Sequence, residues 1–486
     1  MTSLRLGSHA WSVLLLAIVL RAGLFPFADN KHGDAPMRAL IAERLVLEPA
    51  SAAEPRTYCQ FGPLHTTLMR PFIALDGFAP RSSRYLSLLA GIAVLFPFLA
   101  FARRLAPEPG QAELAAFVLA VSPLHLQAST TAASEALYLL LWVAAIERLL
   151  AALASGRART FAAAGLFASL AAVTRYDAWL ALPMVVIAAW WFAPTRGRQL
   201  GRGLVAFAGC AALLPAAWLA WGAARSDDPL FFAHYITADH AGLAATASAR
   251  YGFWLGRLRQ LGVWVLAFAA AMTIPALVLA ARALGGGRRR LSATARLVAV
   301  AALGPPAVYL ARGLVLGSFE PLARFALVPG TLLLPLAAAA VPVARMRGFR
   351  VCTAAAAVAF SIAVWLVATL GRDRIWPGAE SMGALTRLDA EDRALAAHLR
   401  AHRPPHAPAM IEPKAFAEIG IAHAAGVPWT ESITLILTRE PRATLADTVR
   451  ATGARFVAGY EGGWPAQLPD WPQADLYFGR WHLVAR

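Results

Sequence analysis

Residues 84–102 read RYLSLLAGIAVLFPFLAFA, an apolar run of 19 residues that is followed directly by Arg103 and Arg104. A helix of about 20 apolar residues is long enough to cross the hydrocarbon core of a bilayer. Similar runs recur along the 486 residues, which are 58% hydrophobic and only 15% charged, with a mean hydropathy of +0.54. Soluble domains carry about 25% charged residues. The sequence therefore predicts a polytopic α-helical membrane protein.

Eleven apolar runs are long enough to be read as membrane-spanning helices. They cover residues 10–28, 84–102, 112–128, 134–154, 160–175, 177–194, 204–223, 260–283, 295–316, 325–344 and 350–371. A cleaved signal peptide is an alternative for the first run. One Arg in front of it and the lack of a clear small-x-small cleavage site favour a retained span instead.

Arginines gather in alternate connections between these spans and indicate the orientation of the chain. They are Arg103 and Arg104; Arg157 and Arg159; Arg196, Arg198 and Arg202; Arg288, Arg289, Arg290 and Arg296; and Arg345, Arg347 and Arg350. Short cytoplasmic loops carry an excess of Lys and Arg, so we expect a cytoplasmic N-terminus and an extracytoplasmic C-terminus in a bacterial inner membrane. The formal charge of +17 then reflects topology and does not indicate a nucleic-acid partner.

Two domains follow from this topology. Residues 1–371 form a transmembrane module with outer loops 29–83 and 224–259, and residues 372–486 form a periplasmic α/β domain of about 110 residues, long enough for its own core. In that domain the pattern predicts helices over 388–400, 414–425 and 443–452, strands over 409–412, 432–437 and 455–458, and a closing hairpin over 476–484. It contains no Gly-rich phosphate loop and no nucleophile elbow.

The first outer loop concentrates acidic residues beside the membrane, with His32 among them and Arg21 and Arg38 close in sequence. A carboxylate at a dry interface can have a raised pKa and act as a general base. Asp34 could have this role, and it could also cap a helix that begins at Pro36; the two roles are compatible. Asp29 is the second candidate base.

Two further residues near the outer face carry two interpretations each. His65 could hydrogen-bond a substrate or bind a metal, and it could also be an ordinary surface or capping histidine. Glu135 begins the fourth span, where an acid is favourable at the helix N-terminus. If Glu135 faces a cavity, it could instead bind an acceptor or a cation, because ionisable groups in membranes are commonly functional.

Three arginines lie in predicted outer segments, although most arginines of this chain lie in the predicted cytoplasmic loops. Arg175, next to Tyr176 and Asp177, could simply close a turn, and Arg312 and Arg324 could snorkel toward the interface. Together they favour an anionic ligand, since the planar guanidinium pairs well with phosphate oxygens. Arginine beside a phosphate leaving group also stabilises its developing charge.

No cofactor is predicted. The second outer loop holds Asp227, Asp228, His234, Asp239 and His240, which could bind a divalent cation, but their spacing matches no defined metal motif and favours a solvated loop. The three cysteines, Cys59, Cys210 and Cys352, are far apart and form neither a CxxC pair nor a disulfide framework.

Several motifs, taken in order, resemble the C-type (GT-C) membrane glycosyltransferases, in particular glycosyltransferase family 39, the protein-mannosyltransferase and aminoarabinose-transferase group. These motifs are Arg21; Gly33-Asp34 before a helix that ends Ala42-Glu-Arg44; Gly62-Pro-Leu-His65; Arg84-Tyr-Leu-Ser-Leu-Leu-Ala-Gly91; Ser122-Pro with Ser134-Glu135; Thr174-Arg-Tyr176 with Trp179 and Pro183; and Arg324-Phe325 with Pro329. The resemblance covers about the first 345 residues and is looser in the C-terminal domain.

The resemblance implies an inverting transfer of a sugar, hexosyl or pentosyl, from a polyprenyl-phosphate donor to a hydroxyl of a glycan, lipid or protein acceptor. It implies Asp34 as the base, Arg175 and Arg324 as ligands of the lipid phosphate, and no catalytic metal. The substrate-binding set that we expect is Arg21, His65, Glu135, Arg175, Tyr176, Arg312 and Arg324. The family loop often reads Asp-Glu with a following Tyr, whereas this chain has Asp34-Ala35 and Met37, which leaves Asp29 as a competing base.

Two rival classes remain open at the level of sequence. A transporter or flippase of lipid-linked sugars would also have many spans and interior arginines, but it predicts inverted repeats and broken helices without a large outer loop. A non-catalytic anchoring protein would bind its partner through the C-terminal domain. Acceptor-dependent release of the lipid phosphate distinguishes an enzyme from both.

Overall fold

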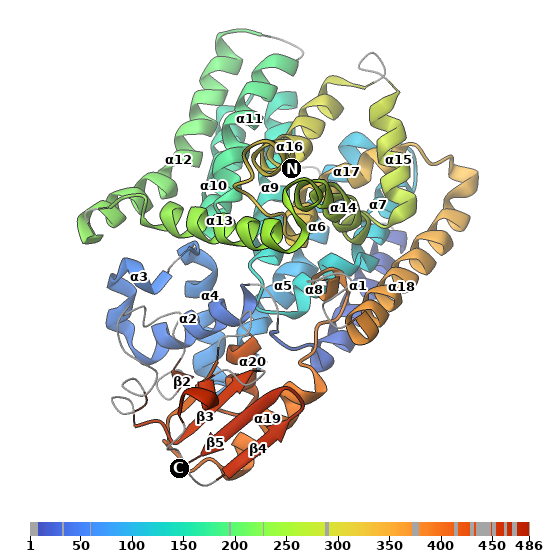
Figure 1. Ribbon diagram of the computed structural model, residues 1–486. Helices are drawn as coiled ribbons and strands as arrows, with labels where there is room; N and C mark the ends of the chain where they lie inside the picture. The colour runs from blue at the N-terminus through green and yellow to red at the C-terminus, as the bar shows by residue number, and fades with distance from the viewer. Residues whose placement is uncertain are drawn as a thin grey trace.

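The computed structural model describes residues 8–31, 34–58, 60–193, 196–226, 228–286, 291–371, 379–412, 417–427, 432–433, 449, 453–460, 464–468 and 474–485. A large helical part occupies most of the molecule, and a small sheet with two helices lies at its lower end (Figure 1). His32, Gly33, Cys59 and Asp227 lie outside the described residues, as do residues 434–437 of one expected strand and all but Val449 of the helix expected over 443–452.

The α-helices follow one another along nearly the whole chain. They are α1 (Ser8–Leu24), α2 (Ala35–Leu47), α3 (Pro55–Tyr58), α4 (Pro63–Leu75), α5 (Tyr85–Ala93), α6 (Leu95–Leu105), α7 (Gln111–Val121), α8 (Pro123–Thr130), α9 (Glu135–Ser155), α10 (Ala158–Thr174), α11 (Asp177–Phe192), α12 (Arg198–Ser226), α13 (Phe231–Tyr251), α14 (Phe253–Met272), α15 (Ile274–Gly285), α16 (Ala293–Ala311), α17 (Leu327–Ala339), α18 (Met346–Gly371), α19 (Ala390–His402) and α20 (Ala417–Ala424).

The expected spans all fall on apolar helices, but these helices differ in length. Six segments are long and apolar enough to cross a membrane: Ser8–Phe27, Ser82–Leu105, Glu135–Ser155, Arg198–Ser226, Ala293–Leu316 and Val343–Thr369. Two bent pairs, α7 with α8 and α14 with α15, could each form one more span, and Ala158–Thr174, Asp177–Phe192 and Ala323–Ala339 are shorter apolar helices. The chain is a multi-pass membrane protein, as predicted.

The span expected over 260–283 is not one continuous helix in the structure. α14 and α15 meet at an angle of 108°, at Thr273, which has a φ of 68°. Pro275 lies in the first turn of α15, where its missing N–H costs no helical hydrogen bond. A milder bend of 59° separates α7 from α8, where the Ser122 hydroxyl accepts from the His125 amide and Pro123 begins the next helix.

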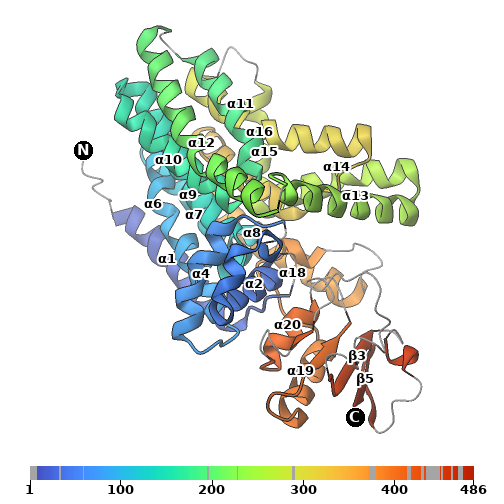
Figure 2. The ribbon, with the colours of Figure 1, turned by 90° about the vertical axis from the view of Figure 1, so that its left-hand side faces the viewer.

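The two expected outer loops are largely helical. Residues 29–83 contain α2, α3 and α4, which lie between the membrane helices and the C-terminal sheet (Figure 1). Ala39 and Ala42 of α2 pack on Met69 and Ile73 of α4. Residues 224–259 contain α13, which lies beside α14 and extends outward with it (Figure 2).

The C-terminal sheet has the strand order β2-β1-β3-β5-β4. Its strands are β1 (Ala409–Ile411), β2 (Ser432–Ile433), β3 (Phe456–Tyr460), β4 (Ala474–Phe478) and β5 (Trp481–Ala485). β1 runs parallel to β2 and β3, whereas β5 runs antiparallel to β3 and β4. Leu399 of α19 and Ile421 of α20 belong to one buried core with Trp481 and Leu483 of β5. A polytopic helical protein with a C-terminal α/β region was the expected fold class, and it is confirmed.

Ion pairs connect the C-terminal region to the first outer segment. Lys31 Nζ lies 2.7 Å from Asp389 Oδ1, and His423 Nε2 lies 3.0 Å from Glu43 Oε2. The sheet region thus contacts the segment that carries Asp34.

Candidate active site

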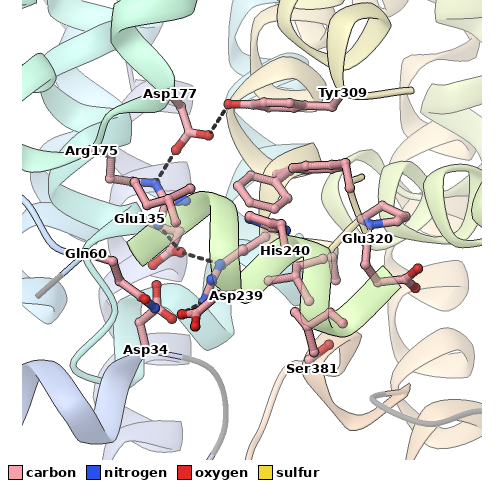
Figure 3. Close-up of a pocket in the computed structure, with 18 of the residues that line it drawn as sticks. Asp34, Gln60, Glu135, Arg175, Asp177, Asp239, His240, Tyr309, Glu320 and Ser381 are labelled. Carbon is pink, nitrogen blue, oxygen red and sulfur yellow. Dashed lines mark hydrogen bonds and ion pairs between the residues drawn. The ribbon is translucent and has the colours of Figure 1, made fainter. Parts of the chain in front are cut away.

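A cavity of about 1160 Å³ opens where several segments meet at the ends of the membrane helices (Figure 3). Its lining comes from the start of α2, residues 60–62, the start of α9, the junction of α10 and α11, helix α13, residues 319–325 and the segment before α19. Six arginines and five carboxylates line it, together with apolar and aromatic side chains. A largely preformed cavity with a few converging charged groups is the usual form of a ligand site.

Asp34 is the carboxylate that α2 presents to this cavity. Its side chain makes no capping hydrogen bond to the helix, and Arg324 Nη1 lies 2.8 Å from its Oδ1 instead. The capping interpretation therefore does not hold for this side chain. Burial alone would raise the pKa of Asp34, but the positive charges of Arg324, Arg38 and Arg175 outweigh it and hold the pKa below 3.8. Asp34 is ionised, which corrects the expectation of a raised pKa.

Glu135, Arg175 and Asp177 form a buried chain of charges beside Asp34. α10 ends at Thr174, and the extended backbone of Arg175 directs its guanidinium toward the start of α9. Arg175 Nη1 lies 2.5 Å from Glu135 Oε1, and its Nε lies 2.7 Å from Asp177 Oδ2. The Tyr309 hydroxyl donates to Asp177 at 2.7 Å (Figure 3). The functional and the turn-closing interpretations of this motif thus coexist: Arg175 lines the cavity and is already paired with two carboxylates.

Arg324 and Arg38 complete the charged end of the cavity. Arg324 lies between the two acids, because its Nε is also 3.7 Å from Glu135 Oε1. Arg38 is 3% exposed and forms no ion pair with a described residue. Its Nε and Nη1 atoms also have no hydrogen-bond partner among the described residues. Its guanidinium lies 4.4 Å from the centre of the Phe61 ring. Burial is the chief cause that lowers the pKa of Arg38 to about 10, so it remains a cation at neutral pH.

Arg38 was not among the expected substrate ligands, although its spacing was a usable signal. It follows Asp34 by four residues, and positions four apart lie on the same face of a helix. Gln60, which extends beside Asp34 in Figure 3, was also not singled out. Nothing in its local sequence pattern marks it, since its place in the cavity depends on the packing of α2 against α4.

An aromatic wall closes another side of the cavity. His240 stacks on Phe319 with ring centres 4.4 Å apart, and Tyr309 stacks on Phe319 at 4.7 Å. Burial and the nearby charge of Arg324 lower the pKa of His240 to about 4, so its ring is neutral. Arg312 lines the same wall, 5.8 Å from the centre of the Phe319 ring, and forms no ion pair with a described residue.

Tyr176 lines the cavity as expected, but its hydroxyl is used by the protein. It donates to the Phe61 carbonyl at 3.2 Å and accepts from Trp218 Nε1 at 3.0 Å. The ring stacks on Phe232 at 4.1 Å. Tyr176 therefore joins the turn before α4 to helices α12 and α13.

Three expected site residues do not line the cavity. Arg21 is fully buried inside the helical bundle, where its Nη2 is 2.7 Å from His125 Nδ1. His65 is buried against Ser87 Oγ at 3.3 Å, and burial, with Arg38 and Arg175, lowers its pKa well below 6.5. Asp29 accepts from the Leu388 amide through its Oδ2 at 3.0 Å and so connects the first outer segment to the C-terminal region.

The residues considered for a cation do not converge either. Asp228 accepts from the Leu230 amide and from His234, at the start of α13, whereas His240 lies in the aromatic wall. Among the described residues, the group with ligand-like spacing is Asp389, Glu391 and Asp392. Those three carboxylates are bound respectively to Lys31, Arg480 and the Trp481 indole. Their oxygens are thus engaged by protein groups.

Comparisons with known proteins agree with the fold. Residues 60–221 match the family model described as dolichyl-phosphate-mannose-protein mannosyltransferase. The structure is similar to ArnT from Cupriavidus metallidurans bound to undecaprenyl phosphate, with a TM-score of 0.69, 14% identity and coverage of 99% of this chain and 98% of that one. No curated protein matches the sequence.

A second similarity extends over most of the chain. The archaeal oligosaccharyltransferase AglB from Archaeoglobus fulgidus, in complex with an inhibitory peptide and a dolichol-phosphate, matches with a TM-score of 0.53 and 12% identity. The match covers 93% of this chain and 69% of that one. These likenesses show that the chain shares the fold of these two proteins.

Proposed function

We propose that this chain, which has the fold of the C-type membrane glycosyltransferases, transfers a sugar from a polyprenyl-phosphate donor to an acceptor hydroxyl at the outer face of a cytoplasmic membrane. The observation that carries the proposal is the cavity in which Asp34 and Glu135 both contact Arg324, while Arg38 lies beside them without an ion-pair partner among the described residues. A glycosyl transfer from phosphate requires both a base and cations for the leaving group, and these residues supply both.

The reaction is a direct displacement at the anomeric carbon. The acceptor oxygen attacks that carbon and forms the new glycosidic bond, and the bond between the anomeric carbon and the phosphate oxygen breaks with its electron pair on the phosphate. Asp34 takes the proton of the acceptor hydroxyl. Attack from the side opposite the leaving group inverts the configuration of the sugar.

Arg38 and Arg324 are the best-supported ligands for the departing lipid phosphate. Arg175 is held between Glu135 and Asp177, so its role is to keep the acids in place. Arg38 forms no ion pair with a carboxylate in the part of the chain that the structure describes, and a buried cation of this kind favours an anionic ligand. Arg312 provides a further cation on the aromatic wall.

Arg324 links donor binding to activation of the base. Arg324 neutralises Asp34 in the structure, and a donor phosphate would compete for the same guanidinium. Loss of that nearby positive charge raises the pKa of Asp34 and makes it a stronger base. The base would therefore become active when the donor is in place.

Bent helices were expected of a transporter, and the structure contains two such pairs. A transporter is nevertheless less well supported than a transferase, because helices of the outer segments line the cavity together with the C-terminal region. A transporter would move the intact lipid-linked sugar between leaflets, whereas a transferase breaks its phosphate bond.

The test uses the purified full chain in liposomes with radiolabelled undecaprenyl-phosphate-linked sugars and candidate acceptors. We expect release of undecaprenyl phosphate that depends on the acceptor and is lost in the Asp34→Asn variant. Transbilayer movement of intact donor without cleavage would instead support the transporter.

A further inference from the structure

The side chain of Asn30 joins two segments that each lead to a carboxylate of the cavity. Its Nδ2 donates to Ser83 Oγ at 3.1 Å, and its Oδ1 accepts from the Ala132 amide at 2.8 Å. Asn30 is 7% exposed, so both ends of the amide are used inside the protein. Ala132 lies in the four-residue elbow 131–134 between α8 and α9.

The hydrogen bond between Asn30 and Ala132 joins two residues that each lie shortly before a carboxylate of the cavity in the sequence. Asn30 precedes Asp34 by four residues, and Ala132 precedes Glu135 by three. The two carboxylates meet again at Arg324, at 2.8 Å and 3.7 Å. The same two segments are therefore connected at two places: by an amide hydrogen bond behind the cavity and by an arginine at its wall.

The elbow before Glu135 is held by further hydrogen bonds. Ser87 Oγ donates to the Ala133 carbonyl at 2.8 Å, and His65 Nε2 lies 3.3 Å from the same Ser87 Oγ. Ser134 Oγ accepts from Arg175 Nη1 at 3.4 Å. Within this group, Asn30 is the residue that ties the elbow to the segment before Asp34.

The backbone of Asn30 is fixed from the opposite side by the C-terminal region. A Cβ added to Gly420 of α20 would lie 2.6 Å from the Asn30 carbonyl oxygen, so the helix and the segment are in close contact. The neighbouring Asp29 amide donates to the Thr386 carbonyl at 2.8 Å, and the Thr386 hydroxyl donates to the Asp29 carbonyl at 2.9 Å. The segment around Asn30 thus contacts the C-terminal region through its backbone and the elbow through the Asn30 side chain.

We propose that Asn30 is a positioning residue that sets the separation of Asp34 and Glu135, with α20 holding it in place. Asn30 does not line the cavity and touches no reacting group. It acts through the peptide group of Ala132, and a displacement of about 1 Å at a reacting centre can cost about a hundredfold in rate. The catalytic part of this role rests on the proposed function.

The experiment compares Asn30→Ala with a matched control, Gln111→Ala. Gln111 is a buried amide as well, 4% exposed, and its Nε2 donates to the Ala339 and Val341 carbonyls, away from the cavity. For the full chain in nanodiscs we measure kcat and the donor KM of transfer, and hydrogen–deuterium exchange of residues 131–138. We expect Asn30→Ala to lower kcat at least tenfold, to leave the donor KM within threefold, and to speed exchange in 131–138, whereas Gln111→Ala changes none of these.

A second variant keeps the proposal testable if Asn30→Ala does not fold. Gly420→Ala removes no hydrogen bond of Asn30 but forces its carbonyl away, and we expect the same loss of kcat at constant donor KM and the same faster exchange. Wild-type kcat, or unchanged exchange in 131–138, in either variant would overturn the role of Asn30. If the wild-type chain transfers no sugar, the proposed function fails, while the exchange comparison still tests the link between the two segments.

Discussion

Arg324 Nη1 lies 2.8 Å from Asp34 Oδ1, and this ion pair joins the start of α2 to the segment that leads into α17. The candidate base and one candidate phosphate ligand therefore neutralise each other. Arg38 is close enough to affect the pKa of Asp34 but forms no ion pair of its own among the described residues. In the proposed mechanism, this single guanidinium connects the binding of an anionic donor to the release of the base.

Replacement of Asp34 by Asn removes the proton acceptor with almost no change in shape. We expect kcat to fall roughly 10²- to 10⁴-fold, the usual range for loss of a general base. Donor affinity should stay the same or rise, since Arg324 loses its anionic competitor. Acceptor-dependent release of undecaprenyl phosphate measures the rate, and normal transfer by this variant would remove Asp34 from the mechanism.

The lowered pKa of Asp34 predicts the pH dependence of the free protein. A group whose folded-state pKa is depressed contributes stability above its unfolded pKa, and that stability is lost as the pH falls through the folded value. We expect the contributions of Asp34 to kcat/KM and to the free energy of unfolding to be constant above about pH 4, and both quantities to fall below it. With saturating donor, the acid limb of kcat should lie at higher pH. A kcat/KM that already declines near neutral pH contradicts an ionised Asp34.

Because Arg38 and Arg175 have different surroundings, we expect an Arg→Gln substitution to weaken lipid binding at Arg38 and to lower stability at Arg175. Arg38→Gln removes a buried cation that is not ion-paired with any residue that the structure describes, so it should weaken undecaprenyl phosphate binding about tenfold or more without lowering stability. Arg175→Gln removes the nearest cation of both Glu135 and Asp177 and should cost roughly 3–5 kcal/mol of folding free energy. Lipid-binding titration and thermal unfolding of both variants measure the two effects. Unchanged binding by Arg38→Gln would exclude it as a phosphate ligand.

Asp29 is predicted to be dispensable as a base. Its Oδ2 accepts from the Leu388 amide, and the side chain does not line the cavity. An Asn at this position keeps an oxygen for that hydrogen bond, so Asp29→Asn should retain kcat within about threefold, because a neutral acceptor costs only roughly 1 kcal/mol relative to a charged one. Transfer assayed in parallel with Asp34→Asn provides the comparison. Loss of activity in Asp29→Asn alone would reverse the assignment of the two acids.

Gly62 is predicted to be required for the approach of α4 to the end of α10. A Cβ at this position would lie 2.3 Å from the Val173 carbonyl oxygen, close to the residues that lead into Arg175. We expect Gly62→Ala to cost about 1–3 kcal/mol of folding free energy and to reduce transfer. Gly209→Ala in α12, where a Cβ meets nothing within 4 Å, is the matched control. Equal thermal stability of the two variants would contradict this close contact.

The helices were more predictable than the contacts between them. Span 134–154 is found as α9, because a long apolar run in lipid has to satisfy its own backbone hydrogen bonds. The break at Thr273 was missed, since apolar composition is the same on both sides of a bend. Asp34 and Glu135 were identified from their places at the ends of helices, whereas Arg21 and His65 have the right residue type but face the protein interior.

The sequence by itself determined that the chain is a multi-pass helical membrane protein and that acids and arginines gather in its predicted outer segments. These properties depend on the length of apolar runs and on local charge, which neighbouring residues set. Only the tertiary structure decided that Asp34 meets Arg324, that Arg175 is already paired, and that Asn30 connects the segments of both carboxylates. Arg324 lies 290 positions after Asp34, Ala132 lies 102 positions after Asn30, and Arg175 lies 40 positions after its partner Glu135. These contacts depend on how whole helices pack, which no local spacing encodes.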